Sequence, residues 1–187
     1  MKKQFDSIEE LHTYINDHVP GAFSIHDMKV LVPEVQKLEP GQTYVEIGVD
    51  SGRSFATAYY STKTGVETFG VDNRNTHERE HVWGELSFPS YSFIHGASAD
   101  IAKIWGVFPI HVLFIDGDHS YDGVKTDIDS WFPFMSSYGV MLFHDYDESS
   151  PGVIRAVSEF VQQTGRKLIV PRNENPELAT SIVKVEI

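Results

Sequence analysis

Ile110-His-Val-Leu-Phe-Ile115 is an almost entirely apolar stretch, rich in residues that favour β-structure. Such a stretch is typical of a central strand in a parallel sheet, because helices cover both faces of that kind of sheet. The polar residues Asp116-Gly-Asp-His119 follow it directly. We therefore expect a buried strand that ends by placing charged side chains at one edge of a sheet.

Outward from this strand, strand-like and helix-like patterns alternate along the chain. Pro33 is expected to kink the second helix or to start a new one. The last two strands have no helix between them and are expected to pair antiparallel. Alternation of this kind predicts an α/β fold with a doubly wound, mostly parallel sheet, whose ligands bind at the carboxyl ends of the strands. The other expected strands cover residues 43–48, 68–72, 91–95, 140–143, 167–170 and 181–185, and the expected helices cover 8–19, 27–38, 51–60, 78–86, 100–105, 121–134 and 151–164.

The composition narrows the function before any motif is considered. The chain has 187 residues, of which 27 are acidic and 15 basic, so its formal net charge of −12 fits one acidic globular domain. An acidic surface repels phosphate backbones and anionic lipids, and we expect neither nucleic acid nor a membrane as a partner. The absence of cysteine excludes disulfide scaffolds, thiolate nucleophiles and iron–sulfur clusters. The first ten residues lack the apolar core of a signal peptide, and no apolar run reaches membrane-spanning length, which favours a cytoplasmic protein.

A glycine-containing turn follows the strand at 43–48. Gly48 and Gly52 permit a tight turn and a close backbone approach to a ligand. Their spacing matches neither the dinucleotide-binding pattern nor a phosphate-binding loop, and an ordinary strand-to-helix turn explains the glycines equally well. Asp72 ends the next strand about 20 residues further on, where an acid binds ribose hydroxyls in dinucleotide folds. The small residues of Gly96-Ala-Ser-Ala-Asp100 leave room for a flat adenine, although Asp100 equally fits a helix cap.

Two further groups of polar residues follow neighbouring strands. Asp116, Asp118 and His119 come after the fourth expected strand along the chain, and His144 and Asp145 come after the fifth. Carboxylates that converge at one edge repel one another unless a cation joins them, and oxygen ligands suit Mg²⁺ or Mn²⁺. A histidine ligand shifts the preference towards Mn²⁺, Fe²⁺ or Zn²⁺. A bound cation would lower the pKa of a coordinated hydroxyl, and a neighbouring histidine or aspartate would take its proton.

These motifs resemble class I S-adenosylmethionine-dependent methyltransferases. The residues that carry the resemblance are Val45–Gly52, Asp72, Phe114–Tyr121 and Phe143–Tyr146. The stretch from 112 to 146 is most similar to small bacterial metal-dependent O-methyltransferases of the macrocin, catechol and cephalosporin-biosynthesis types. The family implies a seven-stranded Rossmann-like sheet with a reversed last strand. Its domain would cover residues 41–187, after an N-terminal helical extension over 1–40 that caps the substrate pocket, with 73–90 as a second flap.

The resemblance also implies roles for individual residues. The metal-dependent relatives hold Mg²⁺ with an acid after the fourth strand and a pair after the fifth, so Asp116, His144 and Asp145 are the implied ligands of Mg²⁺ or Mn²⁺. That pair is usually two acids or an acid and an amide, and this chain departs from the pattern at His144. Either Asp118 or His119 would be the catalytic base, and a homodimer is common among relatives. The implied contacts to S-adenosylmethionine come from Glu46, Gly48, Ser51, Gly52, Asp72, Ser98, Ala99 and Asp116.

The sequence therefore predicts an S-adenosylmethionine-dependent methyltransferase that carries out metal-assisted O-methylation of a small hydroxylated molecule. The first alternative is a metal-dependent hydrolase that uses the same aspartates and histidines to activate water. The second is a noncatalytic module that binds the cofactor without transferring a methyl group. A nicotinamide-dependent oxidoreductase is disfavoured by the glycine spacing.

Overall fold

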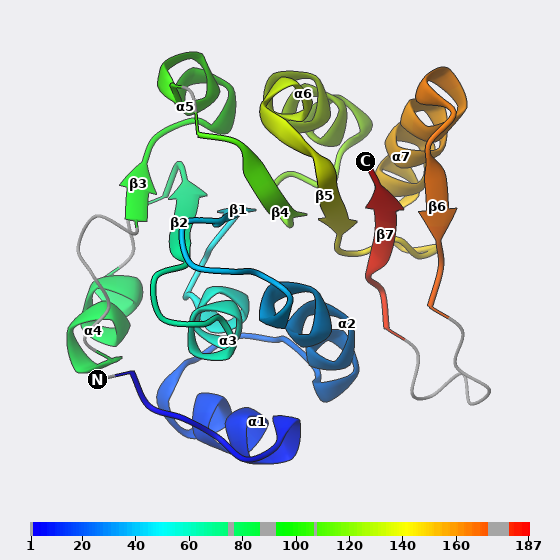
Figure 1. Cartoon of the computed structure of the whole chain (residues 1–187). Coiled ribbons are helices and arrows are strands. Elements are labelled where there is room, and N and C mark those ends of the chain that lie inside the picture. The colour runs from blue at the N-terminus through cyan, green and yellow to red at the C-terminus, as the bar shows by residue number, and fades with distance from the viewer. Residues whose placement is uncertain (1, 75–76, 87–92, 107, 172–179) are drawn as a thin grey trace.

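The computed structural model describes residues 2–74, 77–86, 93–106, 108–171 and 180–187. Within these residues, seven strands form one sheet in the order β3-β2-β1-β4-β5-β7-β6 (Figure 1). Strands β1 to β5 run parallel, whereas β7 is antiparallel to both of its neighbours, which confirms the predicted sheet with a reversed last strand. The strands are β1 (Thr43–Ile47), β2 (Glu67–Asp72), β3 (Phe93–His95), β4 (Ile110–Ile115), β5 (Met135–Phe143), β6 (Lys167–Ile169) and β7 (Val183–Glu186).

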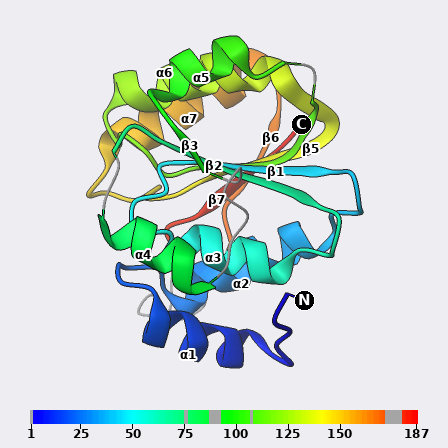
Figure 2. The same ribbon diagram turned by 90° about the vertical axis from the view of Figure 1, so that its left-hand side faces the viewer.

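Helices cover both faces of the sheet, so the molecule has three main layers (Figures 1 and 2). Helices α1, α2, α3 and α4 lie on one side, with α1 outermost, and α5, α6 and α7 lie on the other. A short 3₁₀ helix, η2 (Phe132–Phe134), follows α6. The α-helices are α1 (Ile8–His18), α2 (Ile25–Gln36), α3 (Arg53–Ser61), α4 (His77–Leu86), α5 (Ser98–Ile104), α6 (Tyr121–Trp131) and α7 (Pro151–Thr164).

The position of β4 explains why its sequence is so apolar. Val112 and Phe114 belong to the core cluster that contains the buried residues of α1, α2 and α3, whereas Leu113 and Ile115 belong to the cluster of α5, α6 and α7. All four side chains are at most 3% exposed. Because successive side chains of a strand point to opposite faces, a strand between two helical layers must be apolar on both.

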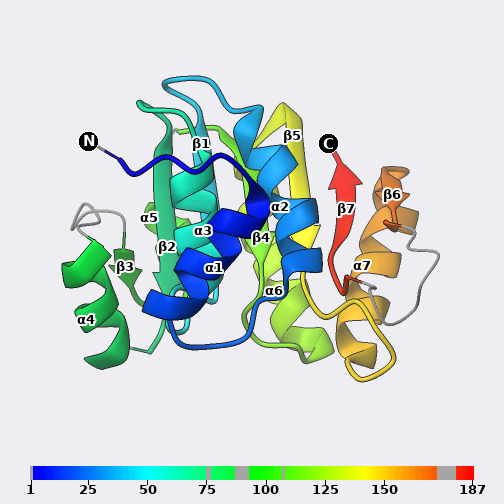
Figure 3. The same cartoon turned by 90° about the horizontal axis from the view of Figure 1, so that it is seen from below.

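The N-terminal helices share a core with the sheet. Ser7 caps α1 by accepting a backbone hydrogen bond, as its sequence pattern predicts. Leu11 and Ile15 then pack in the same apolar cluster as Tyr44 of β1. Figure 3 shows α1 and α2 lying in front of the sheet. The extension over 1–40 is thus built into the α/β layers, and its division from 41–187 stays a prediction.

Two expected helices differ from the structure. Helix α2 continues through Pro33, so no new helix starts there. Pro33 removes one helix hydrogen bond, and the burial of Val32 and Val35 offsets that loss. The helix expected over 121–134 ends at Trp131, because the Phe-Pro-Phe sequence that follows forms a 3₁₀ turn leading directly into β5.

Parts of two expectations lie outside the described residues. These parts are residues 75–76 and 87–90 of the expected flap and residues 91–92 of the third strand. No helix in the described ranges combines the length and the apolar character that crossing a bilayer requires.

Candidate active site

The sheet itself brings the predicted site residues together. The first residue after each central strand stays hydrogen-bonded to the neighbouring strand. The backbone N–H of Gly48 donates to β2 over 2.9 Å, that of Asp116 to β1 over 2.8 Å, and that of His144 to β4 over 3.1 Å. These three residues therefore have backbones as fixed as the strands that precede them.

A cavity of about 800 Å³ opens at the ends of β1, β2 and β4. It lies where the strand order changes direction between β1 and β4, which is where open α/β sheets bind their ligands. Three residues that the resemblance assigns to the cofactor, Glu46, Ser51 and Gly52, are not among the described residues that line this cavity. The predicted residues that do line it are Gly48, Asp72, Ser98, Ala99, Asp116 and Asp118.

The wall of this cavity is acidic. Such a wall attracts a cationic ligand and repels the phosphates of dinucleotides and nucleoside triphosphates. The sequence places Asp72, Asp116 and Asp118 at strand ends, but it does not show that aspartates of α6 and of the turn after β1 join them in one wall. The charged residues of the wall are six aspartates and one arginine: Asp50, Asp72, Asp116, Asp118, Asp122, Asp127 and Arg74.

Gly48 allows β1 and β4 to approach at the floor of the cavity. Its backbone is left-handed, with φ +85°, and a Cβ built on it would lie 2.1 Å from the carbonyl oxygen of Asp116. No side chain fits at that distance. The sequence suggested a close approach to a ligand or an ordinary turn, and the structure adds a third reason for this glycine, the close packing of two backbones.

Asp72 holds the turn after β1 in place. One carboxylate oxygen accepts hydrogen bonds from the backbone N–H groups of Val49, at 3.0 Å, and Asp50, at 2.8 Å, and the other accepts from Arg74 N–H at 2.7 Å. The guanidinium of Arg79 lies 3.3 Å away, and both side chains are at most 5% exposed. Asp72 thus joins the ends of β1 and β2 while it lines the cavity.

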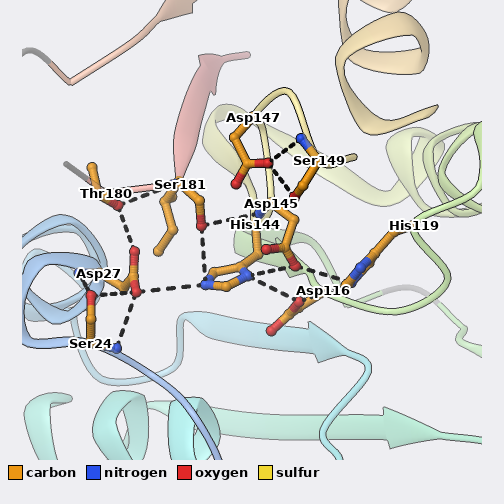
Figure 4. A network of polar contacts seen from close by, with 11 residues as sticks. Ser24, Asp27, Asp116, His119, His144, Asp145, Asp147, Ser149, Thr180 and Ser181 are labelled. Carbon is orange, nitrogen blue, oxygen red and sulfur yellow. Dashed lines mark hydrogen bonds and ion pairs between the residues drawn. The ribbon is translucent and has the colours of Figure 1, made fainter. Parts of the chain in front are cut away.

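A cluster of four ionisable side chains, two aspartates and two histidines, lies beside the cavity (Figure 4). Asp116, His144 and Asp145 each offer one ligand atom, and these atoms all lie within 4.8 Å of one another. His144 Nδ1 is 2.9 Å from Asp145 and 3.4 Å from Asp116. His119 Nε2 is 3.3 Å from Asp145 and 3.4 Å from Asp116. The two strand ends therefore converge as the sequence predicts.

The backbone and the charges of this cluster are both unusual. Asp145 has a left-handed backbone with φ +53°, a conformation that costs about 1 kcal/mol and that aspartate tolerates better than most residues. Burial alone would lower the pKa of His144, but the hydrogen bonds to Asp145 and Asp27 and the charge of Asp116 raise it to about 10. Burial raises the pKa of Asp116, whereas the hydrogen bond to His144 lowers the pKa of Asp145. The cluster is thus strongly coupled and suited to a positive charge at its centre.

Residues 45–146, more than half of the chain, match the model of a methyltransferase domain family. This chain belongs to that methyltransferase family. The matched range runs from β1 to the loop after β5, so it contains the floor of the cavity and the four-residue cluster. The methyltransferase predicted from the sequence is confirmed.

The methyltransferase is also similar to individual proteins. It is 27% identical over 175 residues to the uncharacterized protein R132 of Acanthamoeba polyphaga mimivirus, covering 86% of this chain and 71% of the viral protein. An O-methyltransferase from Bacillus cereus, solved in complex with S-adenosylhomocysteine (SAH), is 14% identical with a TM-score of 0.72, covering 99% of this chain and 92% of that one. MycE, a methyltransferase of the mycinamycin pathway solved with Mg and SAH, is 16% identical with a TM-score of 0.65, covering 99% of this chain and 55% of that one. These two structures support the fold.

Glu46 is one of the residues that the resemblance assigns to the cofactor. Its carboxyl group is fully buried, and it accepts hydrogen bonds from Tyr44 Oη at 2.5 Å and Ser54 Oγ at 2.6 Å. Burial raises its pKa to about 8. Glu46 of the methyltransferase therefore lies in the core and is not among the described residues that line the cavity, and its direct contact with the cofactor stays a prediction.

The raised pKa of Glu46 predicts a pH-dependent stability. The folded state binds this proton more tightly than the unfolded state, whose pKa is near 4.5, so the extra stability is complete below that pH and is lost as the pH rises through about 8. Glu46→Gln is expected to remove this loss, which amounts to up to about 1.4 kcal/mol for each pH unit. Denaturant titrations at several pH values between 5 and 9 measure it. The exposed Glu67 on β2 gives the control Glu67→Gln, and equal pH profiles for both variants and the wild type would show that Glu46 has no such role.

Three buried charged residues of the methyltransferase site were not found from the sequence. Asp127 of α6 lines the cavity, is 6% exposed and accepts a hydrogen bond from Ser98 Oγ at 2.5 Å. Burial raises the pKa of Asp127 to about 6. Arg79 pairs with Asp72, and Asp27 of α2 lies 3.7 Å from His144. The available signal was weak: Asp127 stands next to the apolar face of a helix, and Asp27 follows Ser24 at capping-box spacing.

Helix α4 carries a further pattern that the sequence interpretation overlooked. Residues 77–81 read His-Glu-Arg-Glu-His, a spacing that zinc hydrolases use on a helix. His81 has a side chain that is 73% exposed and lies 3.4 Å from Glu85, whereas Arg79 points into the protein beside Asp72. The side chains of residues 77 and 78 lie outside the described ones. The cluster around Asp116 therefore stays the candidate cation site of this methyltransferase.

Proposed function

We propose that this methyltransferase transfers the methyl group of S-adenosylmethionine to a hydroxyl group of a small molecule, with a divalent cation held beside the cavity. The proposal rests on the position of Asp116. This residue both lines the cavity and belongs to the four-residue cluster. A methyl donor in the cavity and a hydroxyl group at the cluster would meet at this residue. The SAH in the Bacillus cereus enzyme and in MycE supports the donor, and the Mg in MycE supports the cation.

The residues of the cavity fit S-adenosylmethionine on chemical grounds. Its sulfonium group is positively charged and suits the acidic wall. Asp72 stands where ribose hydroxyls are bound in related folds, and its Oδ1 atom, which receives one backbone N–H group, has acceptor capacity left. Its Oδ2 atom already receives two backbone N–H groups and lies 3.3 Å from Arg79. Ala97, Ala99 and Gly117 leave part of the wall flat, which suits a planar adenine.

The donor set of the cluster fits a divalent cation. Two carboxylates and one imidazole converge, with a side chain that is 14% exposed for His144, 20% for Asp116 and 26% for Asp145. When bound, a cation would supply the positive charge that lowers the pKa of the acceptor hydroxyl. An imidazole ligand favours Mn²⁺ over Mg²⁺, since Mg²⁺ prefers oxygen ligands.

His119 is the base that we propose. Its Nε2 atom faces Asp116 and Asp145, and its side chain is 43% exposed, so it is open to an incoming acceptor. The hydrogen bond to Asp116 and the charge of Asp145 raise the pKa of His119, although burial opposes them. A proton taken from the acceptor would be held at Nε2. The alternative base, Asp118, accepts a hydrogen bond from Ser120 N–H at 2.9 Å, just before α6.

Asp72→Ala is expected to weaken SAH binding by about 10-fold or more and to lower the melting temperature. It removes an acceptor for the ribose and also leaves the N–H groups of the β1 turn without their carboxylate, each lost bond costing about 1 kcal/mol. Isothermal titration calorimetry with SAH measures the affinity. Asp122→Asn, which changes another aspartate of the same wall, is the control and should change the affinity by less than about threefold. Wild-type affinity in Asp72→Ala would remove Asp72 from the binding site.

The function is tested by offering S-adenosylmethionine and Mn²⁺ together with a panel of phenols, sugars and polyketides, and measuring SAH release. The expected result is release that depends on one class of acceptor and stops when the cation is chelated. Binding without transfer across the panel would favour the noncatalytic module. Hydrolysis of generic phosphate esters that Asp116→Asn abolishes would favour the hydrolase. The homodimer that the resemblance implies is a further proposal, and light scattering tests it.

A further inference from the structure

We infer that Asp27, at the N-terminus of α2, is a positioning residue of the cation site: it holds the imidazole of His144 so that Nδ1 faces Asp116 and Asp145. The inference rests on the cation that is part of the proposed function. It assigns a role in that site to the N-terminal part of the chain, outside residues 45–146 that match the methyltransferase model.

The two nitrogens of His144 face opposite sets of partners (Figure 4). Nδ1 points to the cluster, whereas Nε2 lies 3.7 Å from a carboxylate oxygen of Asp27 and 3.4 Å from Ser181 Oγ. A neutral imidazole carries its proton on one nitrogen and a lone pair on the other. In the structure Nδ1 makes the shorter contact, 2.9 Å to Asp145, so a bound cation would replace the proton between them. The carboxylate of Asp27 beside Nε2 would then hold the remaining proton of the ring on that side, which leaves the lone pair of Nδ1 for the cation.

Packing against apolar rings does not distinguish the two nitrogens of His144. The ring centroids of Phe23 and Phe114 lie 5.8 Å and 6.0 Å from that of His144 and 6.1 Å from each other, so the three rings pack as a triangle. These apolar neighbours would accept the ring equally well after a half-turn about its Cβ–Cγ bond. The polar partners at Nδ1 and Nε2 are what select one orientation, and Asp27 is the charged one on the Nε2 side.

Asp27 is itself held in place from two parts of the chain. It is 6% exposed, and one of its oxygens accepts hydrogen bonds from Ser24 Oγ at 2.6 Å and Ser24 N–H at 3.1 Å. The other oxygen accepts from Thr180 Oγ1 at 2.7 Å. Because a buried carboxylate without partners is costly, these contacts stabilise its charge and fix its direction. The α2 N-terminus and the segment before β7 thus aim one carboxylate at His144.

A capping role alone does not explain this arrangement. Ser24 and Asp27 form a reciprocal capping box at the start of α2, which accounts for their mutual hydrogen bonds. A cap needs neither the contact with Thr180 nor the approach to His144. The chain offers a variant that separates the two roles: Ser24→Ala removes the side chain of the cap, while the Asp27 carboxylate keeps its hydrogen bonds from Ser24 N–H and Thr180 Oγ1.

The test compares the Mn²⁺ affinity of the full chain with those of Asp27→Asn and Ser24→Ala, by calorimetry and by the electron paramagnetic resonance signal of free Mn²⁺. Asp27→Asn is expected to weaken Mn²⁺ binding by about 10-fold to 100-fold, the usual effect of removing a carboxylate behind a metal-binding histidine. Ser24→Ala is expected to lower the melting temperature about as much as Asp27→Asn does, because both variants damage the cap of α2. It is expected to change the Mn²⁺ affinity by less than about twofold. Circular dichroism checks that each variant is folded.

Three results would overturn the inference, and they can be told apart. Wild-type Mn²⁺ affinity in Asp27→Asn would show that Asp27 does not position His144, with the cation site intact. An equal loss of affinity in both variants would show that only the start of α2 matters. Absence of Mn²⁺ binding to the wild type would remove the proposed cation and this inference together, while SAH binding would still report on the methyltransferase cavity.

Discussion

Asp116→Asn is expected to abolish methyl transfer and to weaken Mn²⁺ binding by about 100-fold or more, because it removes one of the two carboxylates that face Nδ1 of His144. The substitution keeps the size of the side chain. It also keeps the backbone of residue 116, whose N–H bonds to β1 and whose carbonyl group packs against Gly48. The loss would therefore report the charge of Asp116 at the junction of cavity and cluster.

The measurement for Asp116→Asn is Mn²⁺ titration together with SAH release from S-adenosylmethionine in the presence of an accepted substrate. Asp118→Asn is the matched control for cation binding, since Asp118 belongs to the same loop and lines the cavity but lies outside the group of side chains that converge on one point. Wild-type Mn²⁺ affinity in Asp116→Asn would refute the cation site. Loss of affinity in both variants would mean that the loop as a whole, and not the carboxylate of Asp116, is responsible.

Gly48→Ala is expected to lower the free energy of unfolding by about 3 kcal/mol or more. The left-handed backbone accounts for about 1–2 kcal/mol of this cost, and the rest comes from pushing the end of β1 away from β4. The added Cβ would lie 2.1 Å from a backbone oxygen, and the floor of the cavity would have to move to make room. SAH binding should fall with the stability, since the same backbone lines the cavity.

Gly41→Ala separates the two parts of this cost. Gly41 has the same φ of +85°, but a Cβ built on it has no atom within 4 Å among the described residues. We expect Gly41→Ala to cost about 1–2 kcal/mol and to leave SAH binding unchanged. Urea denaturation of both variants gives the comparison. Equal destabilisation would show that backbone strain alone explains Gly48 and that the approach of the two strands is unimportant.

The strand ends could be predicted because the physics that fixes them is local. The apolar run of β4 and the polar residues directly after it are neighbours in sequence, and parallel strands bring such ends to one edge. The convergence of Asp116, His144 and Asp145 follows from that geometry alone. The antiparallel pairing of β6 and β7 is likewise predictable, because two adjacent strands without an intervening helix are most easily joined in this way. That the last strand is the reversed one was implied by the family resemblance.

The residues that reach the site from helices could not be predicted in this way. Asp27 stands 117 positions before His144, and its sequence neighbours explain it as part of a helix cap. Asp127 is buried where it accepts a hydrogen bond from Ser98 of another helix, and Arg79 is buried beside Asp72 of β2. Neither pair consists of neighbours in the sequence. For Glu46 the sequence does not show which way the side chain points, because a residue near the end of a strand can face the cavity or the core. In the structure it faces the core and accepts a hydrogen bond from Tyr44.

The central claim is that the acidic cavity at the ends of β1, β2 and β4 holds S-adenosylmethionine. A calorimetric titration of the wild-type chain with SAH, the product of methyl transfer, tests it most directly. We predict saturable binding of one SAH per chain, accompanied by a rise in melting temperature because the ligand stabilises the folded state. The absence of both heat and thermal stabilisation, with SAH and with S-adenosylmethionine alike, would contradict the account.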